Sequence, residues 1–101
     1  MASKEVGLHE EAFAEVQAAY DWYATRNPAA AAGFIDELDN AVEQIGTFPE
    51  AGISYLLGTR RYVMRRFPFT VIYRDRGNRI EVVAVAHGRR KPGYWKKRIK
   101  H

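Results

Sequence analysis

The spacing of apolar residues changes once along this chain, near Gly46, and that change most restricts the folds open to it. Before Gly46, apolar side chains recur at intervals of three and four residues, as on one face of an α-helix. After it, apolar side chains come in short runs bounded by Gly, Pro and Asn, as in β-strands. A helical first half followed by a stranded second half predicts an α+β domain.

Two helices are predicted in the first half, after a short strand at residues 4–8. The first begins at Glu10, and its apolar face consists of Phe13, Val16, Tyr20 and Tyr23. The second begins at Pro28 with Asn27 as its N-cap, and Gly46 is expected to stop it. Its apolar face consists of Phe34, Ile35, Leu38, Ala41, Val42 and Ile45. The short connection between the helices predicts an antiparallel hairpin.

Three further strands are predicted at residues 60–67, 69–75 and 79–87. The last two flank Arg76-Gly77-Asn78, a typical hairpin turn, and Pro68 marks a bend between the first two. Both alternating sets of side chains in residues 79–87 are apolar, so this strand is expected inside the sheet. The predicted order is β-α-α-β-β-β: a mostly antiparallel sheet packed against an N-terminal helical hairpin, in one domain spanning residues 1–101.

Charge is distributed unevenly between the two halves. Residues 1–50 carry ten acidic and two basic side chains, a net charge of −8, whereas residues 51–101 carry fourteen basic and two acidic ones, a net charge of +12. Such an asymmetry indicates an anionic partner for the second half. The alternative is that the two halves neutralise each other across the fold.

Several classes of protein are not indicated. The chain has no cysteine, and its histidines (His9, His87 and His101) are scattered, so we expect neither disulfides nor a metal site, and no cofactor. It shows no secretory signal and no apolar stretch long enough to cross a bilayer, so we expect a cytoplasmic protein without a membrane partner. The helix carboxylates are interpreted as a solvated face: Asp36, Glu37, Asp39 and Glu43.

The strand predicted at residues 60–67 carries arginine on both faces. Arg61 and Arg65 share one face and Arg66 lies on the other. Guanidinium groups arranged in this way suit phosphate or carboxylate ligands. Charge also protects an edge strand from unwanted pairing, and the sequence leaves both interpretations open.

Residues 86–95 combine a histidine, three successive cations and two aromatic rings. These are His87, Arg89, Arg90, Lys91, Tyr94 and Trp95. The mixture suits RNA, through phosphate pairing and base stacking, and it also suits an acidic protein segment. The structural alternatives are a hydrogen bond made by His87, and packing of Tyr94 and Trp95 onto the sheet.

The order of elements and three local patterns resemble the RelE/ParE toxins of bacterial type II toxin–antitoxin modules. The patterns are the helical stretch at residues 20–23 with 34–38, the strand pair at 65–74 and the ending at 84–95. The resemblance implies a cognate, acidic antitoxin whose C-terminal segment wraps the toxin. It implies one of two targets: RelE-like members cleave messenger RNA in the ribosome without metal, and ParE-like members poison DNA gyrase.

The residues match the two groups unequally. Arg90 and Arg61 fall at basic positions of the RelE-like enzymes, and Tyr94 lies near their usual tyrosine. Thr70 and Val63, however, stand where basic groups are expected. These departures favour a ParE-like gyrase inhibitor, leaving a ribonuclease using Arg61, His87, Arg90 and Tyr94, or a non-toxic binding module, as alternatives. The resemblance and the charge pattern predict a partner-binding set of Arg61, Arg65, Arg66, His87, Arg89, Arg90, Tyr94 and Trp95.

Overall fold

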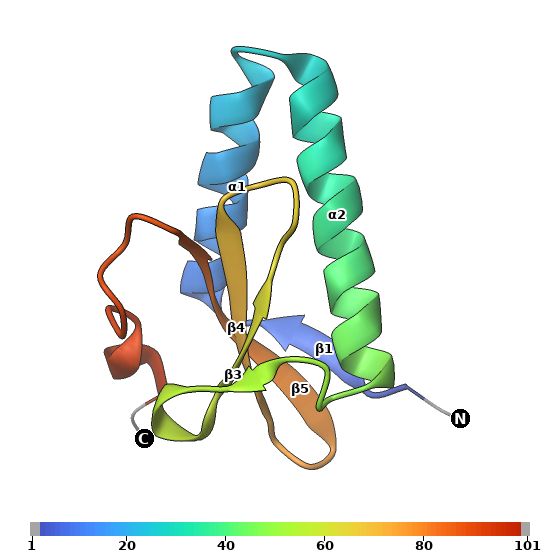
Figure 1. The fold of residues 1–101 in the computed structure, drawn as a ribbon, viewed down its shortest axis with the longest axis vertical. Helices are drawn as coiled ribbons and strands as arrows, with labels where there is room; N and C mark the ends of the chain where they lie inside the picture. Colours follow the sequence, from blue (N-terminus) through green and yellow to red (C-terminus); the bar gives the residue numbers. More distant parts are fainter. Residues whose placement is uncertain (1–2, 100–101) are drawn as a thin grey trace.

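The computed structural model describes residues 3–99 and has the predicted order of elements, with one extra strand and two short 3-10 helices. In chain order the elements are β1 (Glu5–Leu8), α1 (Glu10–Ala24), α2 (Pro28–Thr47), β2 (Ile53–Ser54), η1 (Leu56–Gly58), β3 (Arg60–Val63), β4 (Phe69–Asp75), β5 (Arg79–His87) and η2 (Lys96–Ile99). The α+β class predicted from the periodicity is confirmed. The two long helices lie side by side as a hairpin above the sheet (Figure 1).

The sheet has the strand order β1-β5-β4-β3-β2. Its neighbours are antiparallel except β1 and β5, which pair in parallel, with Leu8 opposite Val82. The prediction of a mostly antiparallel sheet is confirmed, and this is its one parallel pair within residues 3–99. No tight turn joins β1 to β5, because the helical hairpin and three strands separate them in sequence, so their relative direction is set by the fold. The extra strand β2 has only two residues, too few to show alternation.

One face of the sheet packs against the helices. From α2 this core takes the predicted side chains Phe34, Leu38, Ala41 and Ile45, and from the sheet it takes Val71, Tyr73, Ile80, Val82 and Val85. Asn27 caps α2 as predicted, because its side chain accepts a hydrogen bond from the N–H of Ala29 at 3.0 Å. The apolar face predicted for α2 is confirmed.

The apolar face predicted for α1 is half wrong. Ala12 and Ala19 are buried and Val16 and Tyr23 pack against them, but Phe13 is 57% exposed and Tyr20 lies on the surface. The helix turns its small residues toward the sheet, which lets its backbone approach closely, and its large rings toward solvent. Spacing alone identifies an apolar stripe without showing which of two adjacent stripes is buried.

The second helix also continues past its predicted end. Gly46 is a buried residue inside α2, which ends at Thr47. A Cβ on Gly46 would lie 3.0 Å from the carbonyl oxygen of Lys4, so the missing side chain lets α2 pass close to the start of β1. Gly46 is needed for this close approach and does not end the helix.

The opposite face of the sheet is covered by the C-terminal segment. Trp95 is 1% exposed and packs against Ile72, Val83 and Ala84. The sheet thus lies between the helical hairpin and residues 88–99, which appear in red beside it in Figure 1.

A bulge in β5 exchanges the two faces part of the way along the strand. Ile72 pairs with Ala84 and Tyr73 with Val82, so Val83 has no partner of its own in β4. Val83 and Ala84 therefore both belong to the core under the C-terminal segment, while Val82 and Val85 face the helices. The simple alternation read from the sequence holds on either side of the bulge and fails at it.

Candidate functional site

A hollow of about 170 Å³ lies where β5 ends and the C-terminal segment begins. Its wall includes all four residues predicted for a ribonuclease: Arg61, His87, Arg90 and Tyr94. They come from β3, the end of β5 and the loop that follows. The fold therefore brings together residues that are up to 33 positions apart in sequence.

The cationic side chains of this hollow stand beside aromatic rings. The guanidinium carbon of Arg90 lies 3.7 Å from the ring centre of Tyr94, and that of Arg61 lies 5.1 Å from the ring centre of Tyr55. Stacking on a ring restrains a guanidinium while leaving its donors free for an anion. Within residues 3–99, neither arginine pairs with a carboxylate. The hollow, which also includes Lys91, is suited to bind an anionic group.

His87 has a structural hydrogen bond. Its Nδ1 accepts the backbone N–H of Arg89 at 3.0 Å, and its ring meets the ring of Phe69 edge-on at 5.1 Å. While it accepts this bond, Nδ1 is not available to take a proton from a substrate, and Nε2 makes no hydrogen bond within residues 3–99. These contacts support the alternative in which His87 makes a structural hydrogen bond.

The hydroxyl of Tyr94 is also engaged. It donates to Oε2 of Glu15 at 2.6 Å. Burial, together with this hydrogen bond to a carboxylate, raises the pKa of Tyr94 well above that of a free tyrosine. Tyr94 therefore keeps its proton at neutral pH and is held against α1.

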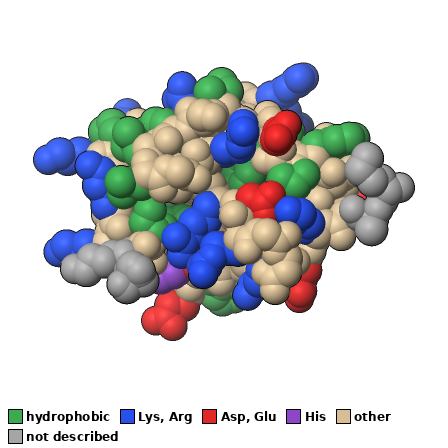
Figure 2. Space-filling model, turned by 90° about the horizontal axis from the view of Figure 1, so that it is seen from below, with side chains coloured by type: hydrophobic (Ala, Val, Ile, Leu, Met, Phe, Trp, Pro, Cys, Tyr) green, Lys and Arg blue, Asp and Glu red, His purple; other side chains and the backbone are tan. Residues whose placement is uncertain are grey.

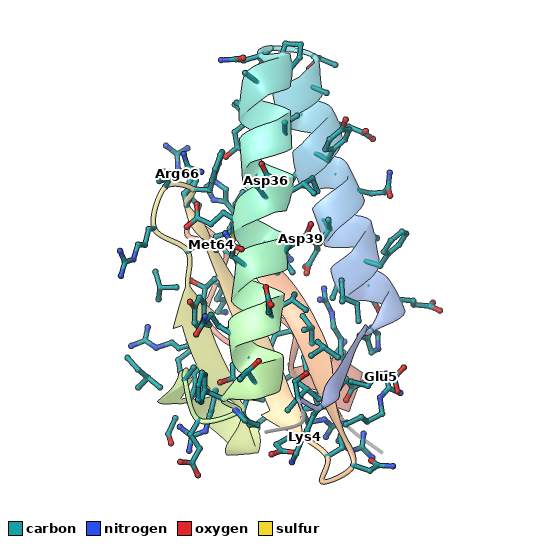
Figure 3. All side chains as sticks on the ribbon, turned by 90° about the vertical axis from the view of Figure 1, so that its right-hand side faces the viewer. Lys4, Glu5, Asp36, Asp39, Met64 and Arg66 are labelled. Carbon is teal, nitrogen blue, oxygen red and sulfur yellow. The ribbon has the colours of Figure 1, made fainter. Side chains whose placement is uncertain are left out.

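The remaining residues of the predicted partner-binding set do not form one cluster. β3 ends at Val63, so Arg65 and Arg66 lie on the connection to β4 and not within a strand, contrary to prediction. Figure 3 shows Arg66 on this connection beside α2. The Arg89 side chain is exposed on the loop after β5, next to the hollow. Trp95 is buried in the core, as the alternative of tail packing predicted, and it also contributes to the wall of the hollow.

The two departures from the RelE-like pattern lie close to the hollow. Thr70 contributes to its wall, and Val63 stands opposite Thr70 in the β3–β4 ladder with its side chain exposed. Metal-free RNA cleavage needs a base, an acid and cations placed at the reacting phosphate. This hollow supplies the cations, while Nδ1 of His87 and the hydroxyl of Tyr94 are already hydrogen-bonded within the protein.

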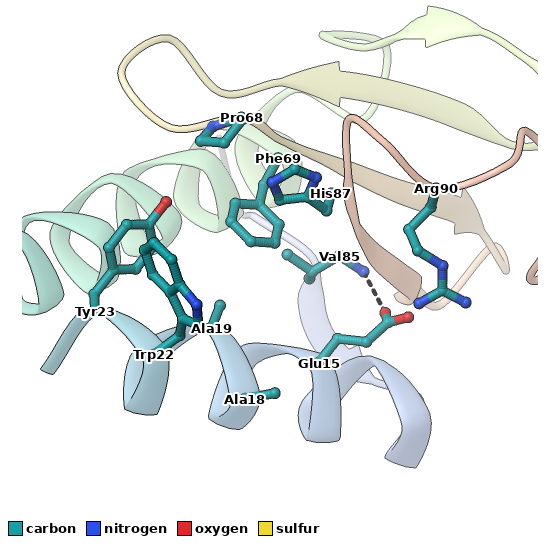
Figure 4. Close-up of a pocket in the computed structure, with 10 residues that line it drawn as sticks. All are labelled: Glu15, Ala18, Ala19, Trp22, Tyr23, Pro68, Phe69, Val85, His87 and Arg90. Atoms are coloured by element: carbon teal, nitrogen blue, oxygen red, sulfur yellow. Dashed lines mark hydrogen bonds between the residues drawn. The ribbon is translucent and has the colours of Figure 1, made fainter. Parts of the chain in front are cut away.

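A second, larger hollow of about 430 Å³ adjoins the first and shares His87 and Arg90 with it. Figure 4 shows it between α1 on one side and the ends of β4 and β5 on the other. Its lining is mainly apolar: Ala18, Ala19, Trp22, Tyr23, Pro68, Phe69 and Val85. The sequence did not single out Glu15 or Trp22 as site residues. The one available signal was the position of Glu15, an acid three residues after buried Ala12 and four before buried Ala19 on one helical face.

Positive charge continues beyond the two hollows. In the described part of the chain, Arg66 and Arg98 pair with acids of the first half, at Glu37, Glu11 and Glu15. Lys and Arg side chains are spread over the lower face, with apolar side chains among them (Figure 2). Partial neutralisation across the fold therefore coexists with a largely unpaired cationic surface.

Neither a metal site nor a membrane span is found in residues 3–99. No three His, Asp or Glu side chains there are placed to hold a metal ion together. The described helices are also too short or too polar to cross a membrane.

Comparison with known proteins gives two results. The family described as "ParE toxin of type II toxin-antitoxin system, parDE" matches residues 6–92. A solved structure titled "Chromosomal ParDE TA system from P. aeruginosa" has the same fold, with a TM-score of 0.73 and 21% sequence identity over 84% of this chain and 96% of that chain. The search of curated protein sequences gave no match. The match over residues 6–92 shows that this chain belongs to the ParE toxin family of type II toxin–antitoxin systems.

Proposed function

We propose that this ParE-family chain inhibits DNA gyrase in the cytoplasm and is neutralised by a cognate acidic antitoxin. One observation carries the choice of target within the wider superfamily: Nε2 of His87 is the one proton-transfer atom of His87 and Tyr94 that makes no hydrogen bond within residues 3–99, whereas RNA cleavage needs both a base and an acid. His87 accepts the N–H of Arg89, and Tyr94 donates to Glu15. A surface that binds through charge and shape needs neither a base nor an acid.

The cationic ending also supports an acidic antitoxin. Arg89, Arg90 and Lys91 are exposed on one loop, and none pairs with a carboxylate of the described chain. Opposite charge on a partner speeds association and excludes wrong partners. An acidic segment that covers this loop would also block its access to a target.

Ribosome-dependent RNA cleavage stays a second candidate, favoured by one specific observation. Arg61, His87, Arg90 and Tyr94 line the same hollow, as that activity would require. Binding of RNA would have to release the Tyr94 hydroxyl from Glu15 before that group moved a proton, whereas Nε2 of His87 could act with its Nδ1 bond intact.

The test uses purified protein in two assays, gyrase with relaxed DNA and translating ribosomes with a defined messenger. We expect inhibition of supercoiling, weakened roughly tenfold by Arg90→Ala, as for one interface arginine. His87→Gln should change it little. Arg79→Ala, which removes an exposed arginine from the opposite end of β5, is the matched control for charge.

The opposite outcome is equally clear. Messenger cleavage that falls by a factor on the order of 10² or more in His87→Gln, with gyrase unaffected, would establish the ribonuclease instead. Inactivity in both assays would identify a binding module without toxicity.

A further inference from the structure

Strand β5 extends beyond the strand that flanks it. Leu8, the last residue of β1, pairs with Val82, and the N–H of His9 donates to the carbonyl of Val82 at 2.9 Å. From there β5 continues to His87 without a neighbouring strand on this edge. Backbone groups left without partners at a half-buried edge are costly, so the protein has to satisfy them in another way.

Two charged side chains take the place of the missing strand. Oε1 of Glu15 accepts the N–H of Val85 at 2.9 Å, and Nη1 of Arg98 donates to the carbonyl of Val83 at 3.1 Å. The two side chains also pair with each other, at 2.9 Å between Nη2 and Oε2. Only 16% of the Glu15 side chain and 10% of the Arg98 side chain is exposed.

The same carboxylate holds the ring on which Arg90 rests. The Tyr94 hydroxyl donates to Oε2 of Glu15 at 2.6 Å, and the guanidinium of Arg90 stacks on the Tyr94 ring at 3.7 Å. Figure 4 shows Glu15 rising from α1 toward the end of β5, with Arg90 beyond it. A chain of contacts thus runs from helix α1, through Glu15 and Tyr94, to Arg90.

We propose that Glu15 is a positioning residue: through Tyr94 it fixes the Arg90 guanidinium between the two hollows, ready to contact the toxin's target. Glu15 itself touches no ligand in this role. Its carboxylate accepts hydrogen bonds from Val85, Tyr94 and Arg98. The Arg98 guanidinium neutralises its charge, which leaves the rim of both hollows cationic. The proposal rests on the proposed function only for its effect on target inhibition, since the placement of Arg90 is measurable without any target.

The direct test is NMR of the full chain, following the side-chain signals of Arg90. A guanidinium over an aromatic ring is shielded by that ring, so its Nε–H and Cδ protons should be shifted upfield. In Glu15→Ala these signals should move toward those of an unstructured arginine. In Glu15→Gln, whose amide oxygen still accepts one hydrogen bond, they should move only part of the way. Glu10→Ala removes an exposed glutamate from the first turn of the same helix and should leave them unchanged.

Tyr94→Phe keeps the ring and removes only its link to Glu15, so it tests the same contact chain if Glu15→Ala does not fold. We expect displaced Arg90 signals in Tyr94→Phe with the rest of the spectrum retained. Unchanged Arg90 signals in Tyr94→Phe and Glu15→Gln would overturn the proposal.

The functional arm is a double-mutant cycle in the gyrase assay. Glu15→Ala should weaken inhibition roughly as much as Arg90→Ala, about tenfold, and the double variant should be no weaker than either. Additive losses would overturn the coupling. Absence of inhibition by the wild type would refute the proposed function alone, because the NMR result stands without it.

Discussion

The carboxylate of Glu37 in α2 accepts the backbone N–H of Arg66, at 3.2 Å from Oε1. It also accepts the N–H of Arg65, so one side chain holds the connection between β3 and β4 against the helix. The interpretation of Glu37 as part of a solvated face is therefore wrong. A carboxylate that receives two backbone N–H groups anchors that loop. Met64 and Arg66 lie beside α2 in Figure 3 as a result.

Glu37→Ala should lower the free energy of unfolding by about 1–3 kcal/mol, because two backbone donors lose their acceptor. Asp36→Ala removes the neighbouring, exposed carboxylate and should change it by less than about 0.5 kcal/mol. Urea denaturation of both variants makes the comparison. Equal effects of the two substitutions would show that Glu37 does not anchor the loop.

Leu38→Asp should unfold or aggregate the protein, since a buried carboxylate without a partner costs several kcal/mol, comparable to the whole stability of a small domain. Phe13→Asp should leave the melting temperature nearly unchanged, because that ring is largely in solvent. Phe13→Asp distinguishes the observed orientation of α1 from the one that its spacing predicted, and Leu38→Asp in α2 shows the effect of a charge at a buried position. Thermal melting followed by circular dichroism is the measurement. If Phe13→Asp unfolds the protein, Phe13 is buried and the face of α1 predicted from the spacing is the correct one.

Two glycines of α2 should respond differently to alanine. At Gly33 a Cβ would meet the Phe67 ring at 3.5 Å, an ordinary contact, so Gly33→Ala should stabilise the helix by about 0.5–1 kcal/mol. At Gly46 the new Cβ would press on the Lys4 carbonyl at 3.0 Å, so Gly46→Ala should gain nothing or destabilise. Chemical denaturation measures both. A matching gain at the two sites would mean that β1 and α2 are not in close contact.

Stability should fall at alkaline pH in a way that depends on Tyr94. Burial and the bond to Glu15 raise the pKa of Tyr94, so above about pH 10 the unfolded chain loses this proton while the folded protein keeps it. The contribution is complete below that pH and declines as pH rises, by at most about 1.4 kcal/mol per pH unit. Tyr94→Phe should flatten the decline between pH 10 and 11, and Tyr20→Phe, an exposed tyrosine, should not. Identical slopes in Tyr94→Phe and wild type would show that the hydroxyl is free in solution.

Local features were predictable because they depend on neighbours in sequence. The Asn27 cap, the turn at residues 76–78 and the bend at Pro68 are all present. Asp75 Oδ1 accepts the N–H of Gly77 at 2.9 Å in that turn, and the N–H of Arg76 donates to the carbonyl of Arg79 at 2.8 Å. Each of these is a contact within a few residues, so residue type is sufficient to indicate it.

Four of the predicted site residues share one hollow, but their contacts could not be predicted from the sequence. Arg61, His87, Arg90 and Tyr94 do line one hollow. Whether the Tyr94 hydroxyl is free depends on Glu15, which lies 79 positions before Tyr94 and meets it only in the folded protein. No pattern within either segment indicates that contact.

The sequence by itself determined the order of the elements, the helical hairpin with its buried α2 face and the cationic ending, because periodicity, capping and composition act along the local backbone. Only the tertiary structure decided which stripe of α1 is buried, that β1 runs parallel to β5, where the bulge at Val83 exchanges the faces of the sheet, and that Glu15 and Arg98 serve the edge of β5 beyond β1. Each of these depends on two segments distant in sequence meeting at one place. Their outcome is set by packing and by the need to satisfy every buried backbone group, which no single segment specifies.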